Sequence, residues 1–419
     1  MQEATRHLLK HHDSALAPGP AGETNGAECC AQLQAINFQS NLPVVIINTG
    51  GVKPSRSKIG ADVCTCGSPK HGDYAGNVTF KVFVMDDDTE LQYPQHYKGL
   101  YLGLQKISQG KKGVDITKTN ASTPADQSSF ILEFEHAQNY DNKSTVTGPV
   151  TFKPWNILYP KKPTSDQTAY LQQALSGFET ALYASDFTDP TNGWRKYANE
   201  TAFADWFIAE ELIKNAKHSY HSAAFMYKDD GKRLALGPIW DLVQGFGTCC
   251  GYPITGYLQN GLSGPGLSGG SAISPNGWLF DICLEPARCK VLEGYDPGDG
   301  IAYWFTRLWQ DPNWRTFVGK RWTQLRGGAW QDSVILAALD AKQAQLAEAG
   351  QRILQEWPEA LAGVNYDGVS SQISEWLTAR LHWLDGAFAL AASGPAFAPF
   401  PSAFPPSATP ASVSQSTAG

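Results

Sequence analysis

The sequence lacks two features that would place it in a membrane or on a nucleic acid. Its longest apolar runs, at 44–47 and 387–392, are far shorter than the roughly 20 residues that a helix needs to cross a bilayer. Lys and Arg form no cluster, and a net charge of −7 with a pI of about 5.7 offers no basic surface for phosphates. We therefore expect no membrane span and no nucleic-acid partner.

We also expect no export signal in the first 30 residues. They carry His, Asp, Pro and Gly where a signal peptide needs an apolar stretch of about 7 to 15 residues. The eight cysteines nevertheless fall in close pairs, and Cys283 with Cys289 would close a short disulfide loop. We therefore expect a secreted or luminal glycoprotein, with a cytoplasmic protein carrying chance sequons and reduced thiols as the alternative. The four glycosylation sequons begin at Asn77, Asn120, Asn142 and Asn199.

The apolar content is sufficient for a folded protein, because 42% of the residues are hydrophobic and 13 are Trp. Residues 1–40 are polar and irregular, and residues 393–419 are rich in Pro, Ala and Ser. Neither flank can bury enough apolar surface to offset the entropy that is lost when its backbone becomes ordered. We predict two disordered flanks around one folded region at 41–392.

Two kinds of pattern divide this region near residue 160. Residues 41–160 hold short apolar runs between Gly, Asp, Asn and Pro clusters, as strands do. Residues 161–392 hold longer stretches with apolar residues three or four positions apart, as helices do. The pattern predicts an α+β protein with a β-rich lobe at 41–160 and a helical lobe at 161–392. Five tryptophans of the helical stretches are expected in the core: Trp304, Trp309, Trp314, Trp322 and Trp330.

One β-hairpin is expected inside the helical part. The runs 223–227 and 233–236 flank an Asp-Gly pair, which is a strong hairpin-turn signal. A helix that Thr201 can cap comes before this hairpin, and Asp241 comes after it. A helix, a loop, a hairpin and then an acidic residue is the order in which protein kinases present a catalytic loop and a metal-binding Asp.

Several motifs then make the sequence specific. YKGLYLGLQKI at 97–107 is followed by GVDI at 113–116, then by FIAEELIKN at 207–215 and GPIWD at 237–241. In this order the motifs resemble the spore-coat CotH kinase family over residues 42–385. Further matches in the family's order are Phe246-Gly247, Trp304 to Leu308, Asp311-Pro312, Arg321-Trp322, Leu325-Arg326 and Trp376-Leu377 with Arg380.

The resemblance implies an atypical protein-kinase-like fold with two lobes, a reduced β-rich N-lobe and a helical C-lobe. It also implies ATP with Mg or Mn as cofactor, and phosphate transfer to Ser or Thr hydroxyls of protein substrates. Such transfer needs one carboxylate to accept the hydroxyl proton, another to hold the metal, and cations on the phosphate oxygens. The resemblance gives Asp241 for the metal and Asn215, Ser222 and Asp115 for the nucleotide.

The chain departs from the family's pattern in four places. Lys217 stands where the catalytic Asp is expected, and a protonated amine cannot accept a proton. Val243 replaces the second Asp of the family's W-D-x-D and has no oxygen for a metal. Gln105 replaces a Glu and cannot form an ion pair. The family's R-G-x-S-S segment and Lys-Lys pair, which belong after residues 72–76, have no counterpart.

Two functions of different classes stay open. One is an ATP-dependent protein Ser/Thr kinase with weak or altered activity, which uses Asp241 for the metal. The other is a pseudokinase that holds a partner protein without catalysis. The two main site residues also have structural alternatives. Asp241 could equally be an Asp that caps a turn, and Asn215 could be the C-terminal residue of its helix.

Overall fold

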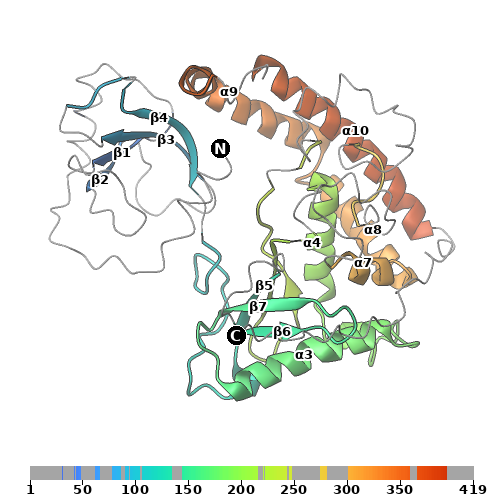
Figure 1. Ribbon diagram of the computed structural model, residues 1–419. Helices are drawn as coiled ribbons and strands as arrows, with labels where there is room; N and C mark the ends of the chain where they lie inside the picture. The colour runs from blue at the N-terminus through green and yellow to red at the C-terminus, as the bar shows by residue number, and fades with distance from the viewer. Residues whose placement is uncertain are drawn as a thin grey trace, which may run out of the picture. The chain divides into compact units, whose positions relative to one another are not determined.

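The computed structural model divides the chain into two compact units (Figure 1). The first comprises 1–116, 251–261 and 329–378, and the second comprises 117–250, 262–328 and 379–419. The pair Cys283 and Cys289 and the two predicted flanks, apart from residues 31 and 393, lie outside the residues that the structure describes. The described residues are 31, 42, 44–48, 62–66, 78–85, 90–93, 95–103, 106–134, 144–215, 220, 222–242, 245–247, 274–280, 301–358 and 366–393.

The first unit contains a four-stranded sheet in the order β2-β1-β3-β4. β1 and β3 run parallel, whereas β2 pairs with β1 and β4 pairs with β3 in antiparallel fashion. Helix α9 (Asp332–Glu356) packs against β4. Gly99 of β4 has a φ of 101°, which suits glycine, and lies beside Ile353 and Trp357 at the end of α9. The strands are β1 (Val44–Asn48), β2 (Asp62–Cys66), β3 (Val78–Met85) and β4 (Tyr97–Gly103).

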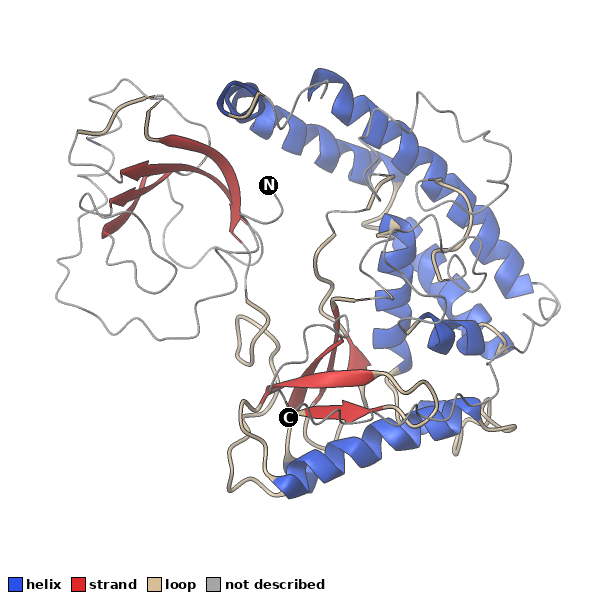
Figure 2. Cartoon of the chain, in the orientation of Figure 1, coloured by secondary structure: helices blue, strands red, loops and turns tan. Residues whose placement is uncertain are grey.

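The second unit contains a five-stranded antiparallel sheet in the order β6-β7-β5-β8-β9. Helix α3 (Ser165–Tyr183) runs along one face of this sheet (Figure 2). A capping box starts the helix, because Thr164 accepts from the backbone of Gln167 and the Gln167 side chain accepts from the backbone of Thr164. The strands are β5 (Phe130–Phe134), β6 (Thr145–Thr147), β7 (Pro154–Tyr159), β8 (Ala224–Lys228) and β9 (Ala235–Leu236).

Aromatic side chains join this sheet to the helices of the same unit. Trp155 of β7 stacks on Trp304 of α7 with ring centroids 5.6 Å apart, and Phe178 of α3 meets Trp304 edge-on at 4.9 Å. Trp304, Trp309, Trp314 and Trp322 are at most 2% exposed, which confirms their expected place in the core, while Trp330 is half-buried. The other helices are α4 (Glu200–Ile213), α7 (Ala302–Leu308), α8 (Pro312–Arg326) and α10 (Tyr366–Ser393).

The α+β class predicted from the sequence is confirmed, and so is the hairpin, whose two strands are β8 and β9. The predicted cap of α4 is wrong by two residues. Asn199, not Thr201, is the N-cap, since its side chain accepts from the backbone of Ala202 at 3.2 Å. Two 3₁₀ turns, at Ala125–Gln127 and Trp194–Lys196, complete the described elements. None of the described helices is long and apolar enough to span a bilayer.

Candidate functional site

The site begins where helix α4 ends. Lys214 adopts a φ of 52° and a ψ of 54°, and its backbone N–H still donates to Glu210 at 2.8 Å. This left-handed residue stops the helix and turns the chain sharply after it. The FIAEELIKN motif therefore ends at a fixed helix terminus, with Asn215 as the first residue beyond the turn.

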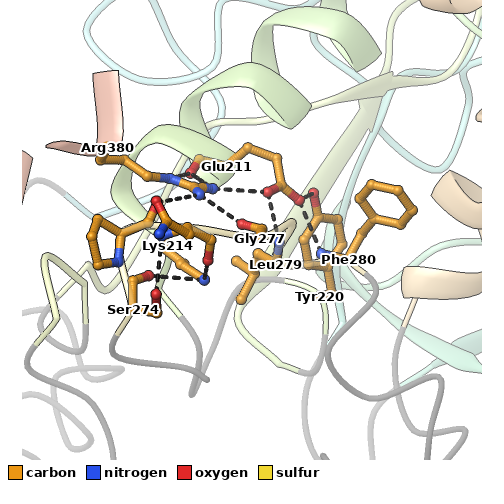
Figure 3. A network of polar contacts seen from close by, with 10 residues as sticks. Glu211, Lys214, Tyr220, Ser274, Gly277, Leu279, Phe280 and Arg380 are labelled. Atoms are coloured by element: carbon orange, nitrogen blue, oxygen red, sulfur yellow. Dashed lines mark hydrogen bonds and ion pairs between the residues drawn. The ribbon is translucent and has the colours of Figure 1, made fainter. Parts of the chain in front are cut away.

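A buried ion pair holds this terminus in place (Figure 3). Glu211 of α4 accepts hydrogen bonds from the backbone of Leu279 at 2.7 Å and of Phe280 at 2.9 Å, and from the Tyr220 hydroxyl at 2.9 Å. Arg380 of α10 donates to the Glu211 carboxylate at 3.2 Å and to the Glu211 main-chain carbonyl at 2.9 Å. Two motifs that lie far apart in the sequence thus meet through side chains that are fully buried.

Arg380 and Lys214 also tie down the segment 274–280. Arg380 donates to the carbonyls of Pro275 at 2.8 Å and Gly277 at 2.6 Å, and Lys214 donates to those of Ser274 at 2.9 Å and Asn276 at 2.6 Å. Burial lowers the pKa of Arg380 to about 10, against the opposing field of Glu211. Both cations carry structural hydrogen bonds and serve to fix the segment.

Asn215 links the end of α4 to the segment that carries Asp241. Its side chain is fully buried, and its Nδ2 donates to the main-chain carbonyl of Asp241 at 2.8 Å. Its Oδ1 has no hydrogen-bond partner within the described part of the chain. The backbone of Phe246 donates to Ile213 at 2.8 Å, and a Cβ on Gly245 would overlap the Ile213 side chain. The segment after Asp241 is therefore pressed onto the helix end.

Asp241 itself is half-buried and has a φ of 54°, a conformation that Asp and Asn adopt more readily than most residues. The ring of the preceding Trp240 packs on Phe225 of β8, with centroids 6.2 Å apart. The Asp241 carboxylate and the Asn215 Oδ1 are oxygen donors, which is the ligand type that Mg²⁺ and Mn²⁺ prefer. Both residues thus carry oxygens of the type that suits a divalent ion, and the bond from Asn215 to the Asp241 main chain makes the residues neighbours.

The other predicted residues are placed as follows. Ser222 is buried just before β8, and Asp115 is exposed in the first unit. Lys217, Val243 and Gln105 lie outside the described residues. The structure therefore brings Asn215 and Asp241 together. No group of three or more His, Cys, Asp or Glu side chains that could hold a metal occurs in the described ranges.

Comparison with known families decides the identity of this fold. A family model described as CotH kinase protein matches residues 80–384. The chain belongs to the CotH kinase family. Its fold is accordingly kinase-like. No curated protein matches the chain.

Sequence reasoning missed one charged pair of this CotH family member. Lys81 of β3 is fully buried and pairs with Glu348 of α9, which also pairs with Arg352 one turn later. Burial lowers the pKa of Lys81, although Glu348 opposes this shift. Protein kinases likewise pair a lysine on a strand of the β-rich lobe with a glutamate on a helix. The available signal was the charge in the middle of the apolar strand Phe80-Lys81-Val82-Phe83.

Proposed function

We propose that this CotH family member binds ATP with Mg²⁺ or Mn²⁺ and transfers phosphate only weakly to Ser or Thr hydroxyls of proteins. The observation that carries the proposal is the bond between the Asn215 side chain and the Asp241 carbonyl. It ties the first residue beyond the α4 turn to the main chain of Asp241, so the two residues are neighbours. In protein kinases, a catalytic-loop Asn and a following Asp are the two residues that hold the metal ions.

Each residue has a limited task in this proposal. Asp241 and Asn215 would hold the divalent ion through their oxygens, and the bound ion would neutralise charge on the phosphates. Ser222, buried just before β8 in the same unit, would add a hydroxyl near the nucleotide. The hydrogen-bonded Glu211 and Arg380 keep Asn215 in position without contacting the nucleotide.

Weak transfer follows from the residues that depart from the family's pattern. Lys217 provides no carboxylate to accept the hydroxyl proton, and Val243 provides no second acidic ligand. A positioned general base contributes about 10² to 10⁴ in rate, so its loss removes most of the activity and spares nucleotide binding. These same two positions favour the second candidate, a pseudokinase that holds a partner protein.

The test of nucleotide binding is a thermal-shift titration with ATP and Mg²⁺ or Mn²⁺. Asp241→Asn is the informative variant, because Asn tolerates the same backbone conformation and removes only the charge. We expect ATP with metal to raise the melting temperature of the parent and to have a much smaller effect on Asp241→Asn. Asp126→Asn, an exposed Asp on the 3₁₀ turn at Ala125–Gln127, is the matched control. A parent protein that shows no shift rules out this function.

The variant Lys217→Asp distinguishes a weak kinase from a pseudokinase. Restoring a carboxylate should raise phosphate incorporation into a generic protein substrate by at least about tenfold if the rest of the site is competent. Lys217→Asn, which removes the positive charge without adding a base, controls for charge alone. Nucleotide binding with no gain from Lys217→Asp would favour the pseudokinase.

We further propose that the protein works in the secretory pathway, on the basis of its paired cysteines and sequons. Asn120 and Asn199 are both exposed, and each accepts a backbone hydrogen bond through its Oδ1, from Ser122 at 2.8 Å and from Ala202 at 3.2 Å. Mass analysis of protein from its native source should find glycan at one or both of these exposed sequons. Absence of glycan from all four sequons would favour the cytoplasm.

A further inference from the structure

Asn156 lies in the middle of the five-stranded sheet with a side chain that is bonded to nothing. It belongs to β7, with β6 on one side and β5 on the other, and it is 0% exposed. Neither its Nδ2 nor its Oδ1 has a hydrogen-bond partner in the ranges that the structure describes. An amide buried in this way is costly, because it gives up its bonds to water and gains none in return.

Folding alone does not call for an amide at this position. Trp155, the neighbour on β7, points to the opposite face, where it packs on Phe134 and Trp304 in the aromatic core. A Leu side chain has the same branching and number of heavy atoms as Asn156 and would bury no polar atoms. A buried amide with neither its donor nor its acceptor satisfied calls for an explanation, and a bound ligand that supplies both partners is one.

The face that carries Asn156 leads to the candidate site. Across four strands, Thr145, Asn156, Glu133 and Phe225 stand directly opposite one another, so they share this face. Strands lie about 4.8 Å apart, which puts Asn156 about 10 Å from Phe225 along the row. Phe225 is the residue against which Trp240 packs, immediately before Asp241. Asn156 and the candidate metal ligand are therefore on connected parts of the same unit.

An asparagine amide presents one donor and one acceptor side by side. Adenine offers the complementary pair, the N6 amino group and N7, and Asn forms two hydrogen bonds with this edge in other recognition systems. Guanine offers two acceptors, O6 and N7, which the amide cannot satisfy together. We propose that Asn156 binds the adenine edge of the nucleotide whose phosphates lie at Asp241. This inference rests on the proposed function and adds the base preference to it.

The experiment measures dissociation constants of the full chain for ATP, GTP and inorganic tripolyphosphate, each with Mg²⁺. We expect the parent to bind ATP roughly 5- to 150-fold more tightly than GTP, the range of one bidentate contact. Asn156→Leu should bring ATP and GTP to within about twofold of each other and leave tripolyphosphate binding unchanged. Its melting temperature without ligand should equal or exceed that of the parent. Thr145→Val, on the same row but exposed, is the matched control and should keep the preference for ATP.

The outcomes separate the two proposals. If the parent binds neither nucleotide nor tripolyphosphate, the proposed function fails and the role of Asn156 fails with it. If the parent binds all three equally, or if Asn156→Leu keeps the preference for ATP, only the role of Asn156 is overturned. Asn156→Ala is measured in parallel, so that a folding defect specific to Leu does not decide the result.

Discussion

The two units each contain a buried ion pair, and the two pairs are built in opposite ways. In the second unit, Glu211 and Arg380 are both fully buried. Besides each other, Glu211 has three hydrogen-bond partners and Arg380 has two among the backbone and hydroxyl groups of Tyr220, Pro275, Gly277, Leu279 and Phe280. In the first unit, Lys81 is fully buried, whereas the Glu348 side chain is 40% exposed and also binds Arg352. A pair saturated with local bonds contributes more to the fold than a pair whose carboxylate reaches solvent and is screened by water.

The largest effect is expected from Arg380→Met. It leaves the Glu211 carboxylate buried without its cation, which costs about 3 to 5 kcal/mol in the free energy of unfolding. Urea denaturation measures this loss. Arg326→Met removes a comparable bond to Asp385, whose side chain is 40% exposed, and should cost about 1 kcal/mol or less. Equal losses in the two variants would contradict the structural role assigned to Glu211 and Arg380.

A smaller effect is expected from Lys81→Met. The variant removes one partner of Glu348, but the Glu348 side chain is 40% exposed and keeps its pair with Arg352, so the remaining charge is not stranded in the core. Urea denaturation should show a loss of about 1 kcal/mol or less in the free energy of unfolding. Lys98→Met, on the neighbouring strand β4, is the control for the loss of one lysine charge. A loss as large as that of Arg380→Met would contradict the difference between the two pairs.

The smallest effect is the pH dependence of the first pair. The pKa of Glu348 is lowered from 4.5; burial acts in the opposite direction but is outweighed by hydrogen bonds from Arg352 and Lys81. Its contribution to stability is therefore present above pH 4.5 and is lost as the pH falls through the folded-state pKa. Unfolding measurements across the acid range should show a steeper decline for the parent than for Glu348→Gln. Parallel curves would mean that the pair adds no stability in solution.

Much of the fold could be predicted from the sequence, because local signals agree with tertiary structure there. The hairpin of β8 and β9 has its Asp-Gly turn, and helix α3 has its apolar stripe of Leu171, Leu175 and Phe178. The cap at Asn199 was missed because Asn199 and Thr201 are both good capping residues and only the backbone geometry chooses between them.

The site was predictable only in part. Asn215 and Asp241 were picked out by their positions in the motifs, and the structure joins them by a hydrogen bond. No local pattern could pair Lys81 with Glu348, because 267 positions separate them along the chain. The empty hydrogen-bonding capacity of Asn156 could not be read from the sequence either, since a polar residue in a short strand usually means an exposed one. Ion pairs between distant residues and buried polar groups without hydrogen bonds arise only when the chain packs, so sequence patterns do not reveal them.

The contact between Gly245 and Ile213 bears on how this sequence has diverged. Position 245 has no room for a side chain, so a mutation there would push the segment after Asp241 away from the end of α4. Two residues earlier, Val243 has replaced an acidic residue of the family's pattern. The altered charge thus stands two residues from a glycine that the packing against Ile213 requires. If the proposed function holds, the steric constraint at Gly245 preserves the approach of this segment to α4 whatever charge stands at position 243.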